Sequence, residues 1–352
     1  MPIYLDNAAT TPVCPQAAQA AFEVMTEGYG NPSSGYELGR QAARRLEADR
    51  AAVAQRLGCG PEELAFVSCG TEGDNWSVLA AAERGKRLGK HIVATAIEHA
   101  AVLEPLRALA GQGCEVTYLR PDRQGHIDPA DLAAALRPDT VLVSMMLVNN
   151  EVGTIQPVAE AARAIKAAGS PALLHTDAVQ AFLKIPFTPQ GLWGVDLLTI
   201  SGHKIRAPKG VGALYVRKGL RFPPLMLGGG QEEGMRPGTE ATAQTAAFAA
   251  ACAVGKAEMN SYTVRMNPNQ RIILSNRKGQ IIQRLIAVPG LIISIAMLLN
   301  TDIDIHRLYG LLNDLHSLRQ NFLQTQASGY QIVIFSYFFR LLFLLTYKKD
   351  SQ

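Results

Sequence analysis

The chain has 352 residues, of which 48% are hydrophobic and 18% charged, and its formal net charge is +4. This length and apolar content suffice for one large hydrophobic core or two moderate ones. Because so small a net charge gives no broad basic surface, it does not favour a nucleic-acid partner.

Short apolar runs and amphipathic stretches alternate along the first part of the chain. The runs predict buried strands and the stretches predict helices such as residues 41–57 and 158–168. Strands that alternate with helices predict an α/β protein with a mostly parallel sheet flanked by helices. The predicted strands are residues 63–68, 91–95, 140–145, 171–176, 195–200 and 212–216.

Polar motifs follow five of these strands. Ligand sites of open parallel sheets gather at the carboxyl ends of strands, so we expect these motifs to converge. The first motif, residues 68–75, contains Gly70 and Thr71. It could open a helix whose N-terminus binds phosphate, or it could be an ordinary cap with Thr71 and Asp74 as a near capping box.

A histidine and an amide-rich loop follow the next two strands. His99 could stack on a flat aromatic cofactor or move protons near it, although a lone histidine is more often structural. Residues 149–154 begin with Asn149 and Asn150, which offer amide donors to a ring hydroxyl or a substrate carboxylate.

A carboxylate and an amide follow the strand at residues 171–176. Asp177 could pair with a protonated pyridine nitrogen, and Gln180 could hydrogen-bond the ring hydroxyl. The alternative for Asp177 is another helix N-cap.

Residues 201–210 follow the strand at residues 195–200 and contain Ser201, His203 and Lys204. A lysine just past a buried strand, beside a hydroxyl and an imidazole, suits a Schiff base to an aldehyde cofactor. These motifs together predict a pyridoxal phosphate (PLP) pocket.

These motifs and several others resemble, in their order, those of the cysteine desulfurases. This family belongs to the class V aminotransferase group of fold-type I PLP enzymes, and the resemblance covers residues 1 to about 256. It rests on residues 4–12, 30–34, 70–72, 98–99, 149–154, 175–180, 201–204, 228–232 and 236–240.

The resemblance implies a role for each matching residue. Lys204 would form the Schiff base and His99 would stack on the ring and assist proton transfer. Asp177 would hold the pyridine nitrogen, Gln180 would lie near the ring oxygen, and Asn149 would face the cofactor and the substrate, L-cysteine. The residues implied to bind the phosphate are Gly70, Thr71, Ser201 and His203, with Thr239 reaching the phosphate of the neighbouring subunit in a homodimer.

The chain also departs from the family pattern. The family carries a nucleophilic cysteine on a flexible loop well after the lysine, whereas no cysteine follows Cys252 here. The family's arginine for the substrate carboxylate has no match either. Tyr36 stands where histidine is common, and Glu233 where arginine is common. Cys69 is the nearest thiol to the expected phosphate loop, but we expect it to serve packing.

The composition changes near residue 257. Residues 257–352 contain four alanines and carry ten Lys and Arg against five Asp and Glu. We therefore expect residues 1–14 to begin a small domain, residues 15–256 to form the large PLP-binding domain, and residues 257–352 to be atypical, non-native or frameshifted. The apolar run at residues 330–347 is interrupted by Arg340 and is short for a membrane span.

The chain's five cysteines form no CxxC pair and no metal-ligand spacing, which is typical of a reducing compartment. With no signal-peptide pattern at the start, we expect a cytoplasmic protein. The expected activity is removal of sulfur from L-cysteine, giving L-alanine and a protein-bound persulfide for a sulfur-acceptor protein or iron–sulfur cluster assembly, impaired by the missing loop. The alternatives are a class V aminotransferase or lyase, or an inactive homologue.

Overall fold

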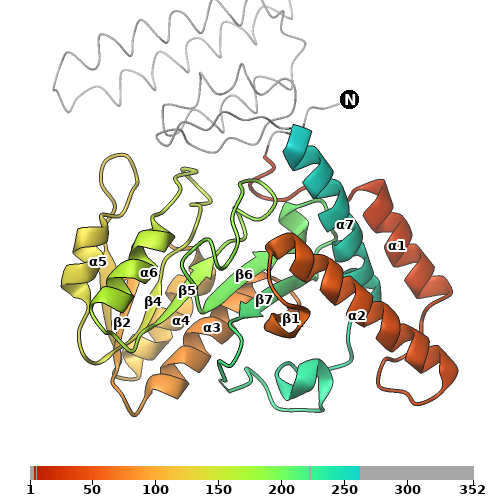
Figure 1. Cartoon of the computed structure of the whole chain (residues 1–352), viewed down its shortest axis with the longest axis horizontal. Coiled ribbons are helices and arrows are strands. Elements are labelled where there is room, and N and C mark those ends of the chain that lie inside the picture. The colour runs from red at the N-terminus through yellow and green to blue at the C-terminus, as the bar shows by residue number, and fades with distance from the viewer. Residues whose placement is uncertain (1–3, 5, 222, 262–352) are drawn as a thin grey trace, which may run out of the picture. The chain divides into compact units, whose positions relative to one another are not determined.

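The computed structural model describes Tyr4, residues 6–221 and residues 223–261. These residues belong to one compact unit. Their centre is a seven-stranded sheet with the order β1-β7-β6-β5-β4-β2-β3 (Figure 1). The strands are β1 Leu64–Val67, β2 His91–Thr95, β3 Glu115–Leu119, β4 Thr140–Ser144, β5 Leu173–Asp177, β6 Leu197–Ser201 and β7 Gly212–Val216.

The sheet is mostly parallel, as the alternation of strands and helices predicts. Strands β6, β5, β4, β2 and β3 run parallel, and β7 is antiparallel to both of its neighbours, β1 and β6. Strand β1 therefore runs in the same direction as β6. The carboxyl ends of β1, β2, β4, β5 and β6 consequently lie along one edge of the sheet.

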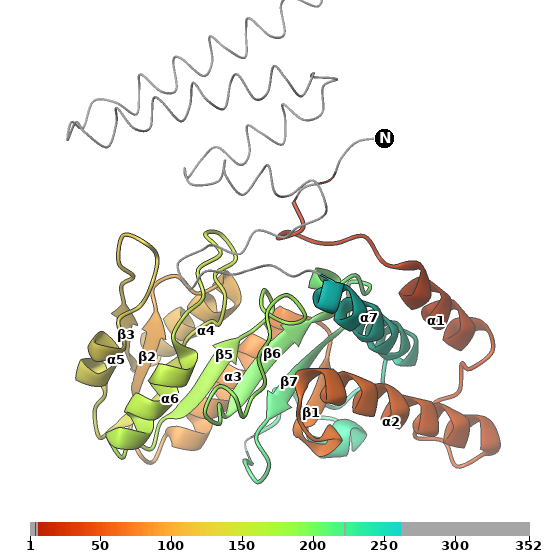
Figure 2. The same ribbon diagram turned by 45° about the horizontal axis from the view of Figure 1, so that its top comes forward.

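Helices cover both faces of the sheet (Figure 2). Successive strand residues point to opposite faces, so one set of strand side chains packs with α3 and α4, and the other with α2, α5, α6 and α7. The first layer contains the fully buried Trp76, and the second contains Phe182 and Phe248 in an edge-to-face pair. These helices are α2 Glu37–Leu57, α3 Gly70–Gly85, α4 Ala100–Gly111, α5 Pro129–Ala135, α6 Val158–Ala167 and α7 Thr242–Ser261.

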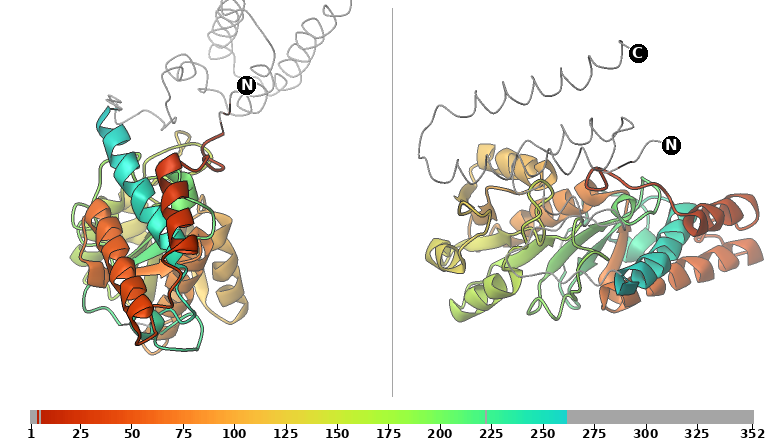
Figure 3. Two further views of the ribbon diagram at one scale, coloured as in Figure 1. Left: turned by 90° about the vertical axis from the view of Figure 1, so that its right-hand side faces the viewer. Right: turned by 90° about the horizontal axis from the view of Figure 1, so that it is seen from above.

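A group of helices lies beside the β1–β7 end of the sheet. Helix α1, Pro15–Thr26, packs along α7, which also packs on α2 (Figures 1 and 3). Helix α7 runs without a break through residue 257, where the composition changes. A boundary at residue 256 would thus fall inside a helix.

The predicted strands correspond to β1, β2, β4, β5, β6 and β7 within two residues at each end. Strand β3 was not predicted from the sequence. It lies at the edge of the sheet, and most of its side chains are partly exposed, so it has no continuous apolar run. No helix of the described residues is long and apolar enough to cross a membrane. The apolar run at residues 330–347 lies outside the described part of the chain.

Candidate active site

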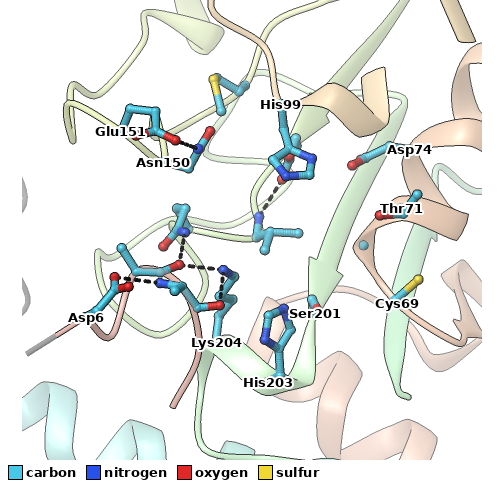
Figure 4. Close-up of a pocket in the computed structure, with 17 residues that line it drawn as sticks. Asp6, Cys69, Thr71, Asp74, His99, Asn150, Glu151, Ser201, His203 and Lys204 are labelled. Carbon is cyan, nitrogen blue, oxygen red and sulfur yellow. Dashed lines mark hydrogen bonds between the residues drawn. The ribbon is translucent and has the colours of Figure 1, made fainter. Parts of the chain in front are cut away.

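The segments that follow β1, β2, β4, β5 and β6 surround one cavity of about 560 Å³ at the carboxyl edge of the sheet (Figure 4). The N-terminal segment closes one side of the cavity with Asp6, Ala8 and Ala9. This volume lies in the range of small-molecule and cofactor sites. The cavity lining includes eight of the ten residues singled out from the sequence: Gly70, Thr71, His99, Asp177, Gln180, Ser201, His203 and Lys204.

One end of the cavity can receive an anion. Helix α3 begins at Gly70 after Cys69, whose side chain makes no capping hydrogen bond, so the first amides of the helix have no side-chain cap. The Ser201 hydroxyl faces the same space, and its oxygen is buried without a hydrogen-bond partner. A Cβ at Gly70 would come within 2.9 Å of Val179 Cγ2, so a larger residue there would displace the Val179 side chain.

The capping-box alternative for Thr71 and Asp74 is wrong. Thr71 lies inside the first turn of α3 rather than before it, and Asp74 is buried in the wall of the cavity. Glu72, also in the first turn, accepts a hydrogen bond from the amide of Ser68, which precedes the helix, at 2.7 Å. Glu72 also pairs with Arg236 at 2.8 Å.

Asp177 is the last residue of β5, and its carboxylate lines the cavity. No α-helix begins there, so the helix N-cap alternative is wrong. One carboxylate oxygen instead accepts a hydrogen bond from the Val179 amide at 2.8 Å within a turn. Burial, and then the negative charge of Asp74, raise the pKa of Asp177 to about 7. Burial alone raises the pKa of Asp74 to about 7.

Lys204 ends a short 3₁₀ turn, Gly202–Lys204, directly after β6. Its amine donates hydrogen bonds to the Ala8 carbonyl and, at 2.9 Å, to the Ala9 carbonyl. Burial lowers the pKa of Lys204, although the charges of Asp177 and Asp6 oppose the shift. A lowered pKa favours the neutral amine, which is the form that attacks an aldehyde.

The two histidines of the cavity are held differently. His99 is the N-cap of α4, and its Nδ1 accepts the Ala101 amide at 3.1 Å, so the remaining proton lies on Nε2. His99 therefore has a structural role as well as a place in the cavity lining. His203 Nδ1 lies 3.2 Å from the Thr10 hydroxyl, and burial lowers the pKa of His203 to about 4, which keeps its ring neutral.

Asn149 does not face the cavity as expected from the sequence. Its amide donates to the Ile97 carbonyl at 2.8 Å and accepts the backbone amides of Glu151 and Val152. Both ends of the side chain are thus occupied in shaping the loop. The cavity is lined instead by Asn150 and Glu151, which follow it.

Thr239 is exposed and is not among the residues that line this cavity. It lies on a loop that two ion pairs hold against α2 and α3. Glu232 pairs with Arg50 at 2.6 Å, and Arg236 pairs with Glu72. Glu232 and Glu233 both have a left-handed backbone, which is rare for residues with a side chain.

Among the described thiols, Cys69 lines the cavity, whereas Cys14 and Cys252 are fully buried. Burial raises the pKa of Cys59 to about 12 and raises that of Cys252 further. These buried thiols are poor nucleophiles.

Sequence reasoning missed several groups at the site. The carbonyls of Ala8 and Ala9 could not be found from their residue types, because the contact depends only on the path of the backbone. Asp74 was seen only as a possible cap. The carboxylate of Glu151 and the side chain of Met146 also line the cavity.

The fold is that of the class V aminotransferases, and residues 3–268 match the family model "Aminotransferase class-V". The chain belongs to this family, whose members depend on PLP. The match extends past residue 256, where the resemblance was expected to end.

The relatives of this chain within the family are cysteine desulfurases. It is 46% identical over 238 residues to "Cysteine desulfurase IscS" of Methanosarcina thermophila, which covers 68% of this chain and 58% of the relative. It is 48% identical over 240 residues to "Cysteine desulfurase" of Trichormus azollae, with the same coverage. The chain thus spans less than two thirds of the length of these curated relatives.

Solved structures agree with these matches. A "NIFS-LIKE PROTEIN" superposes with a TM-score of 0.72 at 41% identity, over 74% of this chain and 71% of that one. The structure "SspA in complex with cysteine" gives a TM-score of 0.68 at 34% identity, over 71% and 72% of the two chains. DndA from Streptomyces lividans gives 0.66 at 43% identity, over 74% of each.

Proposed function

We propose that this chain binds PLP in the cavity and attaches it through Lys204. The observation that carries the proposal is that the cavity holds both the partly desolvated amine of Lys204 and the buried hydroxyl of Ser201, which has no hydrogen-bond partner and lies near the first residue of α3. An aldehyde that also carries a phosphate suits both groups. The cavity volume and the Asp177 carboxyl are suited to a pyridine ring of this kind.

Each residue then has a defined task. The amides of Gly70 and Thr71, the Ser201 hydroxyl and the neutral His203 would hold the phosphate. Asp177 would face the ring nitrogen, where its raised pKa lets it share a proton, and Gln180 would donate to the ring oxygen. His99 would cover the ring and carry a proton on Nε2. The bound group would supply electron withdrawal from the substrate's α-carbon.

The substrate proposed for this site is L-cysteine or a related amino acid, by analogy with the desulfurase relatives. The activity would remove sulfur from L-cysteine to leave L-alanine, with the sulfur passing to a protein thiol as a persulfide and then to an acceptor protein or iron–sulfur cluster assembly. No cysteine follows Cys252 in this sequence. We therefore expect cofactor binding to be retained and sulfur transfer to be impaired. We further propose that the chain forms a homodimer in which Thr239 reaches the phosphate of the PLP bound by the neighbouring subunit.

The absence of a later cysteine from the sequence favours a second candidate, a class V aminotransferase or lyase reaction. Such a reaction needs Lys204 but no protein thiol as sulfur acceptor. Incubation with L-cysteine separates the candidates. A persulfide trapped on the protein supports desulfuration, whereas a keto acid or free sulfide without protein persulfide supports the second candidate. No product from any amino acid would indicate an inactive homologue.

The test of the site is Lys204→Ala. Wild-type protein mixed with PLP should develop the visible absorbance of the bound cofactor, and Lys204→Ala should not. Lys166→Ala is the matched control, because Lys166 lies exposed on α6. An unchanged spectrum in Lys204→Ala would contradict the assignment.

A further inference from the structure

A second lysine lies close to the site without lining the cavity. Lys184 is partly buried in the turn segment that follows β5. Its amine donates a hydrogen bond to Gln180 Oε1 at 2.7 Å. No carboxylate of the described residues forms an ion pair with Lys184. A desolvated ammonium without a carboxylate is costly, so its retention calls for a reason.

The hydrogen bond from Lys184 continues into the site. Gln180 Nε2 donates to the Ala8 carbonyl at 2.8 Å, and the same carbonyl accepts a hydrogen bond from Lys204. The Ala8 carbonyl can only accept and the Lys184 amine donates to Oε1, so the two partners fix both ends of the Gln180 amide. The amide can turn only its remaining N–H toward the cavity that Gln180 lines.

The backbone next to Lys184 has an uncommon conformation. Leu183, directly before Lys184, has φ 56°, a left-handed value that is unfavourable for a residue with a side chain. Leu183 packs against α7, where a Cβ added at Gly255 would come within 2.9 Å of Leu183 Cδ1. Residues held in this way concentrate at functional sites.

The charges around Lys184 belong to the same site. Burial, and then the charge of Lys204, lower the pKa of Lys184 to about 7. Lys184 in turn contributes to the lowered pKa of His203, after burial and the charges of Lys204 and Lys209. A donor with cationic character on Oε1 polarises the amide and strengthens its N–H groups as donors.

We propose that Lys184 is a positioning residue that acts through Gln180: it orients and polarises the Gln180 amide toward the cofactor's ring oxygen and holds the Ala8 carbonyl on Lys204. This inference rests on the proposed PLP site and adds a residue that does not touch the cofactor.

Lys184→Met tests the proposal because it keeps the length of the side chain and removes the donor. The dissociation constant for PLP should rise about tenfold, in line with the loss of one charge-assisted hydrogen bond. Lys184→Arg, which keeps a cationic donor, should remain within about threefold of wild type, and the exposed control Lys166→Met should not change. Gln180→Ala should weaken binding by itself, and adding Lys184→Met to it should have little further effect.

A second measurement needs no cofactor. In wild-type apoprotein the Thr11 amide donates to the His203 carbonyl at 3.0 Å, beside the Ala8 and Ala9 contacts. Lys184→Met should increase hydrogen exchange at Thr11, and Lys184→Arg should restore its protection.

The outcomes separate the two proposals. The role of Lys184 is refuted if Lys184→Met binds PLP as tightly as wild type. It is also refuted if the effects of Lys184→Met and Gln180→Ala on PLP binding add fully. In both cases the proposed PLP site itself remains supported. If Lys184→Met does not fold, Lys184→Arg provides the test: weaker PLP binding with an unchanged melting temperature would refute the role of Lys184. If wild type binds no PLP, both proposals fail.

Discussion

Asp74→Asn should change how the stability of the apoprotein depends on pH. Asp74 is 1% exposed, and burial raises its pKa from 3.8 to about 7. His175 Nε2 lies 3.4 Å from its carboxylate, but burial lowers the pKa of His175 to about 4, so no positive charge offsets Asp74 near neutrality. The carboxyl must therefore be ionised without an ionic partner when the pH exceeds about 7.

The direction of the effect follows from proton binding. Between about pH 4 and pH 7 the folded protein keeps the Asp74 proton, whereas the unfolded chain has released it. The free energy of unfolding therefore falls as the pH rises through this window. A pKa difference of about three corresponds to at most about 4 kcal/mol, and we expect about 2–4 kcal/mol after relaxation. Asn cannot ionise, so Asp74→Asn should remove this part of the decline.

Urea unfolding of apoprotein between about pH 5 and about pH 8 measures the difference. Wild type should lose stability across the range, and the curve of Asp74→Asn should be flatter by about 2–3 kcal/mol, because about two pH units of the window lie within this range. Asp131→Asn, at an exposed position in the first turn of α5, is the control and should follow wild type. Parallel curves for wild type and Asp74→Asn would refute the reasoning. Buried Asp177 and Glu98, with pKa values raised to about 7 and about 8, should leave some decline in the variant.

Two further predictions concern the loop and the thiols. Arg50→Met should lower the free energy of unfolding by about 3–5 kcal/mol, because it leaves the Glu232 carboxylate buried without its partner. In the same urea assay, the double variant Arg50→Met with Glu232→Gln should recover part of this loss. If the effects of the two substitutions on the free energy of unfolding simply add, the reasoning is contradicted. Thiol labelling of native protein followed by mass spectrometry should modify Cys69 and spare Cys14 and Cys252. Added PLP should slow labelling of Cys69 but not of Cys114, and equal labelling of Cys69 with and without PLP would place the cofactor elsewhere.

Much of the fold could be predicted because buried strands of a parallel sheet have continuous apolar sequences. Such runs located six of the seven strands, and β3 escaped because an edge strand buries too few side chains to show a run. The residues after each strand could then be assigned to one site without knowing the strand order. Parallel strands bring their carboxyl ends to a common edge whatever their order.

The sequence by itself thus determined the parallel α/β class and eight of the residues around the cavity, because local apolar patterns and motifs after strands carry that information. Only the tertiary structure decided how each side chain is used. Asn149 and Asp74 have suitable chemistry, but their burial and partners come from segments distant in the chain. The link from Lys184 through Gln180 and Ala8 to Lys204 joins residues up to 196 positions apart, and no local pattern records such a contact.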